Sequence, residues 1–322
     1  QTGNCINGSP TIDAEGTVYI GGPGKMFAFY PDLTVKWTSP ALGSNMTGAT
    51  IAADGTLVFG SGFNMYGLKP TDGTVKWTFA TGAAVSGDTA LGPLGTVYSG
   101  STDNKLYALD AKGNKLWAYP TADNIYASPA LAADGTVYMG SMDKSLHAVN
   151  PDGSKKWSFF MGAPVFNSSA VIGADGTIYA GSYDGTNGTV YAITKAGAQK
   201  WSYAVTGGVT SALAIGADGT LYVGTYDGKM YAFGGCTVDG QCQDDDACTV
   251  SKCVNLACSH SPTTGNTCDD GKVCTEKDVC LLGQCTGVTA TCDDSQACTL
   301  DSCDPTSGCK HLGKLVDVAV GG

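Results

Sequence analysis

Arginine is absent from this chain of 322 residues, and glutamate occurs only at Glu15 and Glu276. The formal net charge is -11, because 29 acidic residues, nearly all aspartate, outnumber 18 lysines. An acidic chain repels phosphate backbones and anionic membranes, and without arginine it lacks the side chain that binds phosphate or carboxylate through two parallel hydrogen bonds. The composition therefore argues against nucleic-acid and membrane-surface binding and is typical of a protein dissolved outside the cell.

Long apolar runs and helix-period stretches are missing as well. No run approaches the roughly 18 residues of a membrane span. The chain begins at Gln1 with no apolar leader, as expected of a secreted protein after signal removal. Its three histidines, His147, His260 and His311, show no Ser/His/Asp or His-cluster spacing. We therefore expect an extracellular or cell-surface protein that is not an enzyme.

A repeat dominates the first two thirds of the sequence. The only tryptophans lie 40, 40, 40 and 44 residues apart, at Trp37, Trp77, Trp117, Trp157 and Trp201. Each unit opens with a short apolar run and an acidic-Gly turn such as Asp54-Gly55, whose glycine readily takes positive φ. Further short strands follow, the last of which carries the tryptophan. Hairpin-linked strands with this period predict the blades of a β-propeller, with the tryptophans as blade-packing residues.

The last unit is incomplete. Six turns of this kind, counting the degenerate Leu94-Gly95, predict an all-β chain with a six-bladed propeller over residues 1–235, followed by a disulfide-rich, loop-dominated repeat region. The sixth unit ends at Phe233 and Gly234 with no tryptophan-bearing strand. The N-terminus begins too late to supply that strand. We therefore predict that the last blade lacks its own outer strand and has an open edge.

Cysteine is nearly absent from the repeats, where it occurs only at Cys5, but residues 236–322 contain thirteen. Twelve of them form three aligned sets of four within residues 236–311: Cys242, Cys248, Cys253, Cys258; Cys268, Cys274, Cys280, Cys285; Cys292, Cys298, Cys303, Cys309. An even total of fourteen predicts seven disulfides in an oxidising compartment. Three connectivities stay open for each set. A zinc site is disfavoured because no Cys-x2-Cys pair occurs.

Cys5 and Cys236 remain after the three sets are formed. They precede the first blade and follow the last, and these two points are neighbours in a closed ring. We predict a disulfide between them that closes the ring and contributes up to about 5 kcal/mol in the chain-entropy model. The alternative is that each cysteine pairs with another partner.

Clustered aspartates in the cysteine-rich region are the candidate metal ligands. They are Asp244, Asp246, Asp269, Asp270, Asp293 and Asp294. Calcium prefers such carboxylate oxygens, but the spacing matches no EF-hand loop, and solvated turns explain the same residues. We expect no cofactor, with calcium as the one ion that these groups could hold.

One unit shows a family resemblance, through Asp134-Gly135-Thr136-Val137-Tyr138, Leu146-His147-Ala148-Val149 and Lys155-Lys156-Trp157. Over residues 7–235 the chain resembles the pyrroloquinoline-quinone-type propeller repeat superfamily, which includes quinoprotein dehydrogenases and cofactor-free scaffolds of bacterial envelopes. The dehydrogenases usually have eight blades and often a disulfide between adjacent cysteines. This chain has six units and no adjacent cysteines, so the resemblance implies a non-enzymatic member.

The cysteine-rich region resembles the Cys-Thr-x-Asp-x-Cys repeats of extracellular matrix proteins, most clearly at Cys298-Thr299-Leu300-Asp301-Ser302-Cys303. This second resemblance implies an extracellular setting and names no activity.

Residues 312–322 form a C-terminal tail with the alternation of a β-strand, in which the assembly residues are Leu315, Val316, Val318 and Val320. Such a strand can pair with the open blade of its own chain or of the next one. The leading hypothesis is a secreted, disulfide-stabilised structural protein, a filament or matrix subunit that assembles with itself head to tail. The alternatives are a propeller on a cysteine-rich stalk that binds glycan or matrix protein, and a quinone-dependent oxidoreductase.

Overall fold

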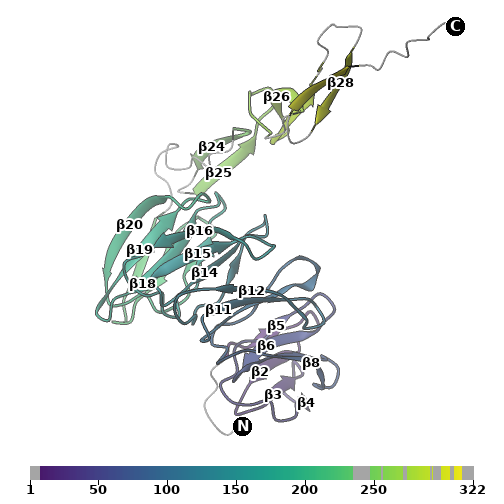
Figure 1. Cartoon of the computed structure of the whole chain (residues 1–322). Coiled ribbons are helices and arrows are strands. Elements are labelled where there is room, and N and C mark those ends of the chain that lie inside the picture. Colours follow the sequence, from purple (N-terminus) through teal and green to yellow (C-terminus); the bar gives the residue numbers. More distant parts are fainter. Residues whose placement is uncertain are drawn as a thin grey trace, which may run out of the picture. The chain divides into compact units, whose positions relative to one another are not determined.

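The chain divides into two compact units, Gln1–Gly234 and Gly235–Gly322 (Figure 1). The computed structural model describes residues 8–234, 247–254, 257–270, 274–290, 292, 299–304 and 308–313. Strands dominate both units, and the described residues include only a single-turn 3-10 helix, η1 (Pro93–Gly95). The predicted all-β fold class is confirmed. The described residues contain no helix of the length and apolarity that a membrane crossing requires.

Unit Gln1–Gly234 contains six antiparallel sheets in chain order. The first consists of β1 (Thr11–Ile12), β2 (Val18–Gly21), β3 (Met26–Phe29) and β4 (Val35–Thr38). The second consists of β5 (Thr50–Ile51), β6 (Leu57–Ser61), β7 (Asn64–Leu68) and β8 (Val75–Ala80). The third consists of β9 (Ala90–Leu91), β10 (Val97–Ser101), β11 (Lys105–Leu109) and β12 (Lys115–Pro120).

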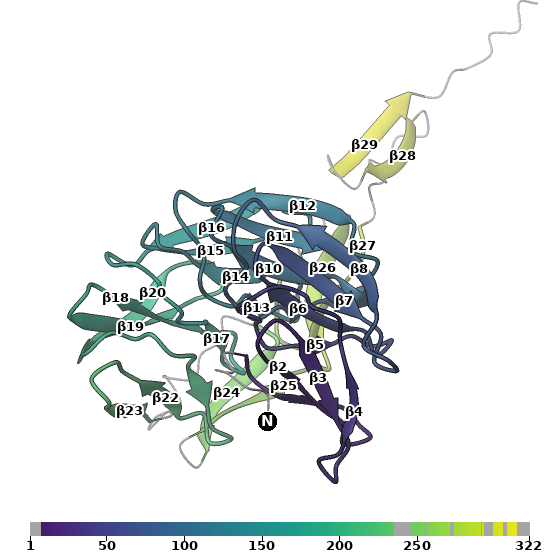
Figure 2. The same cartoon turned by 90° about the horizontal axis from the view of Figure 1, so that it is seen from below.

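The fourth sheet consists of β13 (Ala130–Leu131), β14 (Val137–Gly140), β15 (Ser145–Val149) and β16 (Lys155–Phe160). The fifth consists of β17 (Val171–Ile172), β18 (Ile178–Tyr183), β19 (Asn187–Ile193) and β20 (Gln199–Thr206). The sixth has three strands, β21 (Ala214–Ile215), β22 (Leu221–Gly224) and β23 (Met230–Phe233). Figure 2 shows the sheets following one another around an axis as propeller blades, with fourth strands such as β4, β8 and β12 toward the outside.

The turn between the first two strands of a blade follows from its Asp-Gly-Thr sequence. In the second blade, Gly55 has a φ of 79°, which glycine adopts without steric cost. The Thr56 N–H donates to Asp54 Oδ1 at 3.0 Å, so the aspartate stabilises the turn that glycine permits. The strand β6 that follows begins with three consecutive apolar residues, Leu57, Val58 and Phe59, and all five of its residues are buried.

Small residues let neighbouring blades approach closely. In the first five blades the second strand carries a glycine covered by an apolar side chain from the segment that leads into the next blade, so a Cβ there would overlap that side chain. The pairs are Gly21–Met46, Gly60–Val85, Gly100–Ile125, Gly140–Val165 and Gly181–Val209. The core therefore lies between the sheets, and it continues from blade to blade.

The tryptophans connect each blade to the following one. The Trp37 ring lies against Gly73 of the next blade, and its Nε1–H donates to the Pro70 carbonyl at 2.8 Å. Trp117 and Trp157 repeat this arrangement on the third and fourth blades. The tryptophan at the start of each fourth strand is therefore a junction residue as well as a core residue.

Unit Gly235–Gly322 contains three hairpins in its described part. They are β24 (Thr249–Val254) with β25 (Ala257–Pro262), β26 (Thr275–Leu281) with β27 (Gln284–Thr289), and β28 (Thr299–Asp304) with β29 (Gly308–Gly313). Each set of four cysteines thus contributes one hairpin, which the sequence did not specify.

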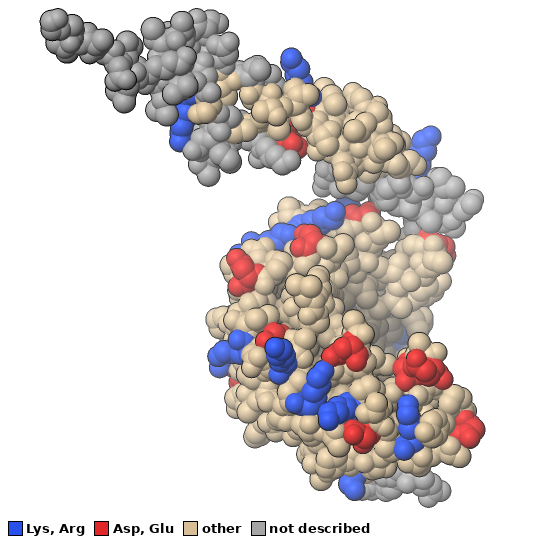
Figure 3. Space-filling view, turned by 90° about the vertical axis from the view of Figure 1, so that its right-hand side faces the viewer, with Lys and Arg blue, Asp and Glu red and all other residues tan. Residues whose placement is uncertain are grey.

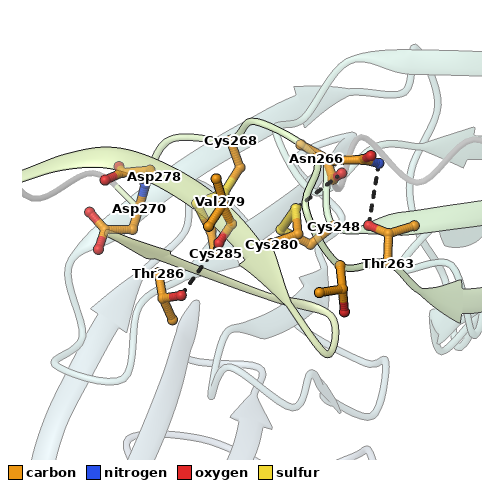
Figure 4. Close-up of a disulfide and its surroundings, with 12 residues drawn as sticks. Cys248, Thr263, Asn266, Cys268, Asp270, Asp278, Val279, Cys280, Cys285 and Thr286 are labelled. Atoms are coloured by element: carbon orange, nitrogen blue, oxygen red, sulfur yellow. Dashed lines mark hydrogen bonds between the residues drawn. A yellow bond between two sulfur atoms is a disulfide. The ribbon is translucent and has the colours of Figure 1, made fainter. Parts of the chain in front are cut away.

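Three disulfides join described cysteines: Cys248–Cys280, Cys268–Cys285 and Cys292–Cys309. The expectation that each set pairs internally is wrong for Cys248, which is bonded to the second set (Figure 4). The Gly283 N–H, in the turn of the second hairpin, also donates to the carbonyl of Thr263, directly after the first hairpin, at 3.1 Å. The first two hairpins are therefore joined both covalently and by a hydrogen bond.

Candidate functional site

The outer edge of the sixth blade is the candidate functional site. Its sheet ends at β23, whereas the third strand of every other blade is covered by a fourth. Burial shows the difference. β15, the equivalent strand of the fourth blade, has four buried residues, whereas β23 has none. Met230 of β23 is 70% exposed, and among the described residues no strand pairs with the outer side of β23.

The residue opposite each tryptophan is small in all five complete blades. The cross-strand pairs are Ala28–Trp37, Gly67–Trp77, Ala108–Trp117, Ala148–Trp157 and Ala192–Trp201. Ala232 of β23 occupies the same register position, because it pairs with Tyr222 as Ala148 pairs with Tyr138. The sixth blade thus keeps the space for a large apolar side chain on an added strand.

Lysines of the fourth strands bind the acidic turns of their own blades. Lys76, directly before Trp77, lies 2.6 Å from Asp54 Oδ2 and 2.9 Å from Thr56 Oγ1. The hydrogen bond from Lys76 lowers the pKa of Asp54 to about 2, with the Thr56 hydrogen bonds adding to the effect. A fourth strand such as β8 therefore supplies a cation to the acidic turn of its blade in addition to the last strand of the sheet.

Several predicted residues lie outside the described part of the chain. These are the proposed ring-closing Cys5 and Cys236 and the tail residues Leu315, Val316, Val318 and Val320. The same holds for Asp244, Asp246, Asp293 and Asp294. The Cys5–Cys236 disulfide and the docking of the tail therefore stay predictions.

Two of the candidate calcium ligands, Asp269 and Asp270, lie near Asp278 of β26, and one carboxylate oxygen from each falls within 4.8 Å of the others. Figure 4 shows Asp270 beside Asp278. The Asp270 N–H donates to Asp278 Oδ2 at 2.9 Å, and the Thr275 hydroxyl donates to Asp270 Oδ1 at 2.7 Å. Sequence spacing missed Asp278 because the hairpin, rather than a local motif, brings it to the pair. Three carboxylates can hold Ca²⁺, but hydrogen bonds within the cluster already account for their arrangement.

His147 lies between two blades and is not arranged as a catalytic base. Its Nε2 lies 2.9 Å from Asp143 Oδ2 and its Nδ1 lies 3.2 Å from the Tyr119 hydroxyl. A neutral ring with its proton on Nε2 satisfies both contacts. The imidazole is 7% exposed, and burial lowers its pKa although Asp143 opposes the effect. Its position in β15 corresponds to Tyr107 in β11, as expected of a structural strand residue.

Charge does not mark another site on the face of the molecule shown in Figure 3. Lysine and acidic side chains are interspersed there, with no broad field of one sign. Lysines and aspartates also pair within the blades, as Lys156 and Asp134 do at 3.1 Å.

Comparison with known proteins supports the propeller assignment. The family model for the outer membrane protein assembly factor BamB matches residues 61–186 and 144–241, which together span more than half of the 322 residues. The designed protein Ika8 aligns with a TM-score of 0.61 at 14% identity, over 70% of each chain. The WD40 propeller of Doa1 aligns with a TM-score of 0.56 at 16% identity, over 72% of this chain and 79% of that one. At such identities these two likenesses show the fold alone.

Curated relatives match only a short stretch. Protein psiQ of Dictyostelium discoideum is 32% identical over 109 residues, which are 24% of this chain and 11% of that protein. Protein psiR of the same organism is 34% identical over 89 residues. The chain spans about a tenth of the length of these relatives.

Proposed function

The chain belongs to the family of the outer membrane protein assembly factor BamB, and from that premise we propose that it is a non-enzymatic structural protein of the extracellular space. Its propeller serves as a rigid body, and its open sixth blade accepts a β-strand. The strand donor is the C-terminal tail of another copy, so that copies join head to tail into a filament or matrix.

The observation that carries this proposal is the three-stranded sixth sheet. An exposed sheet edge presents a row of unpaired N–H and C=O groups and is a template for another strand. Strand addition obtains affinity from main-chain hydrogen bonds and specificity from alternate side chains. Here the edge strand β23 is held by its pairing with β22, and Ala232 leaves space beside it.

The cystine-rich unit supports an extracellular location. Disulfides persist in oxidising compartments and stabilise small segments that cannot bury a large core. Unit Gly235–Gly322 fits this pattern, because its described elements are two-stranded hairpins held by disulfides such as Cys268–Cys285. Isolated two-stranded hairpins are marginal in water, so the cross-links supply the stability that the core does not.

Electron microscopy and sedimentation of the purified protein test the proposal. We expect the intact chain to form filaments or higher oligomers, and a chain ending at Lys314 to stay monomeric because it lacks the donor strand. Near-ultraviolet circular dichroism of both proteins checks that the propeller is unchanged. Monodisperse monomers from both proteins would contradict the proposal.

A further inference from the structure

The acidic turns of the complete blades show what an added strand must provide. In three blades, the lysine before the tryptophan contacts both the aspartate and the threonine of the turn. The lysine Nζ distances are 2.6 and 2.9 Å for Lys76, 3.1 and 2.8 Å for Lys156, and 3.2 and 2.9 Å for Lys200. In the first blade Lys36 contacts Thr17 at 3.2 Å. The fourth strand therefore regularly brings a cation to this turn.

The third blade shows that the lysine and the acidic turn go together. There Leu94 takes the place of the turn aspartate, and Leu116 takes the place of the lysine before Trp117. Where the carboxylate is lost, the lysine is lost as well. A retained aspartate in this turn therefore indicates a blade whose fourth strand supplies a lysine.

The sixth blade keeps the turn but has no lysine for it. The Thr220 N–H donates to Asp218 Oδ1 at 3.0 Å, and the Thr220 hydroxyl donates to Asp218 Oδ2 at 2.9 Å, an arrangement shared with Asp175 and Thr177 in the fifth blade. In the fifth blade Lys200 completes the group. Among the described residues, no lysine forms an ion pair with Asp218.

The first blade limits the size of the residue that the added strand can carry. Trp37, Trp77, Trp117 and Trp157 each lie against a glycine of the following blade, four residues before that blade's own tryptophan. The equivalent residue of the first blade, which follows the sixth around the ring, is Leu33, with a φ of 65° and 76% exposure. A tryptophan placed as in the other blades would overlap this leucine, so a smaller apolar residue fits there.

We propose, on the basis of the strand-addition function above, that Asp218 and Thr220 are the recognition site for Lys314 of a second copy. Residues 314–322 of that copy then form the fourth strand of the sixth blade. These nine residues suffice, because the fourth strands of the complete blades are four to eight residues long. The segment has one lysine, which precedes an alternating valine series.

The register follows from antiparallel pairing. In the complete blades the turn-binding lysine directly precedes the tryptophan that lies opposite the small residue, as Lys156 precedes Trp157 opposite Ala148. Lys314 in the lysine position therefore places Leu315 in the tryptophan position, opposite Ala232, and leucine is small enough to lie beside Leu33. The acidic turn lies at the same end of the sheet as Lys314, because Leu221, directly after Thr220, pairs with Phe233. The lysine and its acceptors therefore meet at one end of the new strand pair.

A charge exchange between full-length variants tests the proposal. Asp218→Lys and Lys314→Asp should each raise the critical concentration for assembly, measured by sedimentation, about two- to fivefold, as for an exposed ion pair. The double variant should return to the wild-type value. Asp152→Lys is the matched control, because Asp152 also accepts hydrogen bonds from the N–H and Oγ–H of the residue two positions on, Ser154, but lies in a blade that already has its fourth strand. Single variants that assemble like wild type, or a double variant that does not recover, would overturn the proposal.

A second measurement separates this inference from the proposed function. A labelled synthetic peptide of residues 314–322 is titrated into the full-length protein and followed by fluorescence anisotropy. Weaker peptide binding by the Asp218→Lys chain supports the recognition site even if the protein forms no polymer. Polymers that form independently of Asp218 and Lys314 preserve the structural function and overturn the recognition site. Monomers that bind no peptide, as when the tail occupies its own blade, overturn both.

Discussion

His147 in the fourth blade occupies the position that Tyr107 occupies in the third. The Tyr107 hydroxyl donates to Asp103 Oδ2 at 2.5 Å, and the His147 imidazole makes the corresponding contact with Asp143. The two side chains fill the same place between blades, but only the imidazole can take up a proton near neutral pH. The groups facing it are Asp143, Tyr119 and Lys155.

We expect the stability of the propeller to fall as the pH drops below about 6.5. The pKa of His147 is lowered in the folded state, mainly by burial. Its contribution to stability is therefore present above the unfolded-state pKa of 6.5 and is lost as the pH falls through the folded-state pKa. Denaturant unfolding at pH 7.5 and pH 5 measures this loss. In the His147→Tyr variant, the free energy of unfolding should differ less between pH 7.5 and pH 5 than it does in the wild type. An unchanged difference would show that other groups cause the pH dependence.

Gly113 should tolerate no side chain, because the Trp77 ring occupies its space. Its φ is 81°, and a Cβ built on it would lie 2.6 Å from that ring. Gly113→Ala therefore combines backbone strain with overpacking and should lower the free energy of unfolding by about 3 kcal/mol. Gly228→Ala is the control, since Gly228 has a φ of 79° with no atom near its Cβ position, and about 1 kcal/mol is expected. Equal losses in the two variants would contradict a packing role for Trp77.

At the scale of strands and hairpins, the repeat period determined the propeller but not the second unit. The alternation of apolar and polar residues and the Asp-Gly turns indicated the strands, because each blade repeats the same short turn and strand sequences. The disulfide partner of Cys248 and the carboxylate of Asp278 could not be predicted from local motifs. Contact between the first two hairpins brings Cys248 to Cys280 across 32 residues, and the pairing of the segment before β26 with β26 brings Asp270 to Asp278 across 8 residues. The open edge was predicted from the missing tryptophan strand. The sequence did not predict that Asp218 lacks a lysine, because this depends on the contacts between fourth-strand lysines such as Lys76 and the acidic turns of the other blades.

Breaking the Cys248–Cys280 disulfide should separate the first two hairpins. The chain-entropy model gives about 4 kcal/mol for closing a loop of 32 residues. In the Cys248→Ser, Cys280→Ser double variant, hydrogen exchange should speed up in Thr275–Leu281 and Gln284–Thr289, while the propeller strands keep their protection. Unchanged exchange in these two strands would show that hydrogen bonds alone hold the junction.

For the whole molecule, the Cys5–Cys236 disulfide stays a prediction that peptide mapping can check. Mass spectrometry of the unreduced, digested protein should detect the two peptides joined. The Cys5→Ser, Cys236→Ser double variant should lose up to about 5 kcal/mol of propeller stability, because the disulfide closes a loop of more than 200 residues. Free thiols at both positions would leave the ring without this closure.

The disulfide between Cys248 and Cys280 also has a mechanical consequence. A filament pulled from both ends would load its subunits in series, and hydrogen-bonded hairpins are the parts that would otherwise unravel first. The bond carries the force past the segment between two cysteines that are 32 positions apart, which stretched out would release about 110 Å of slack. In the proposed filament, the cross-link that connects two sets of cysteines would therefore make each subunit less extensible.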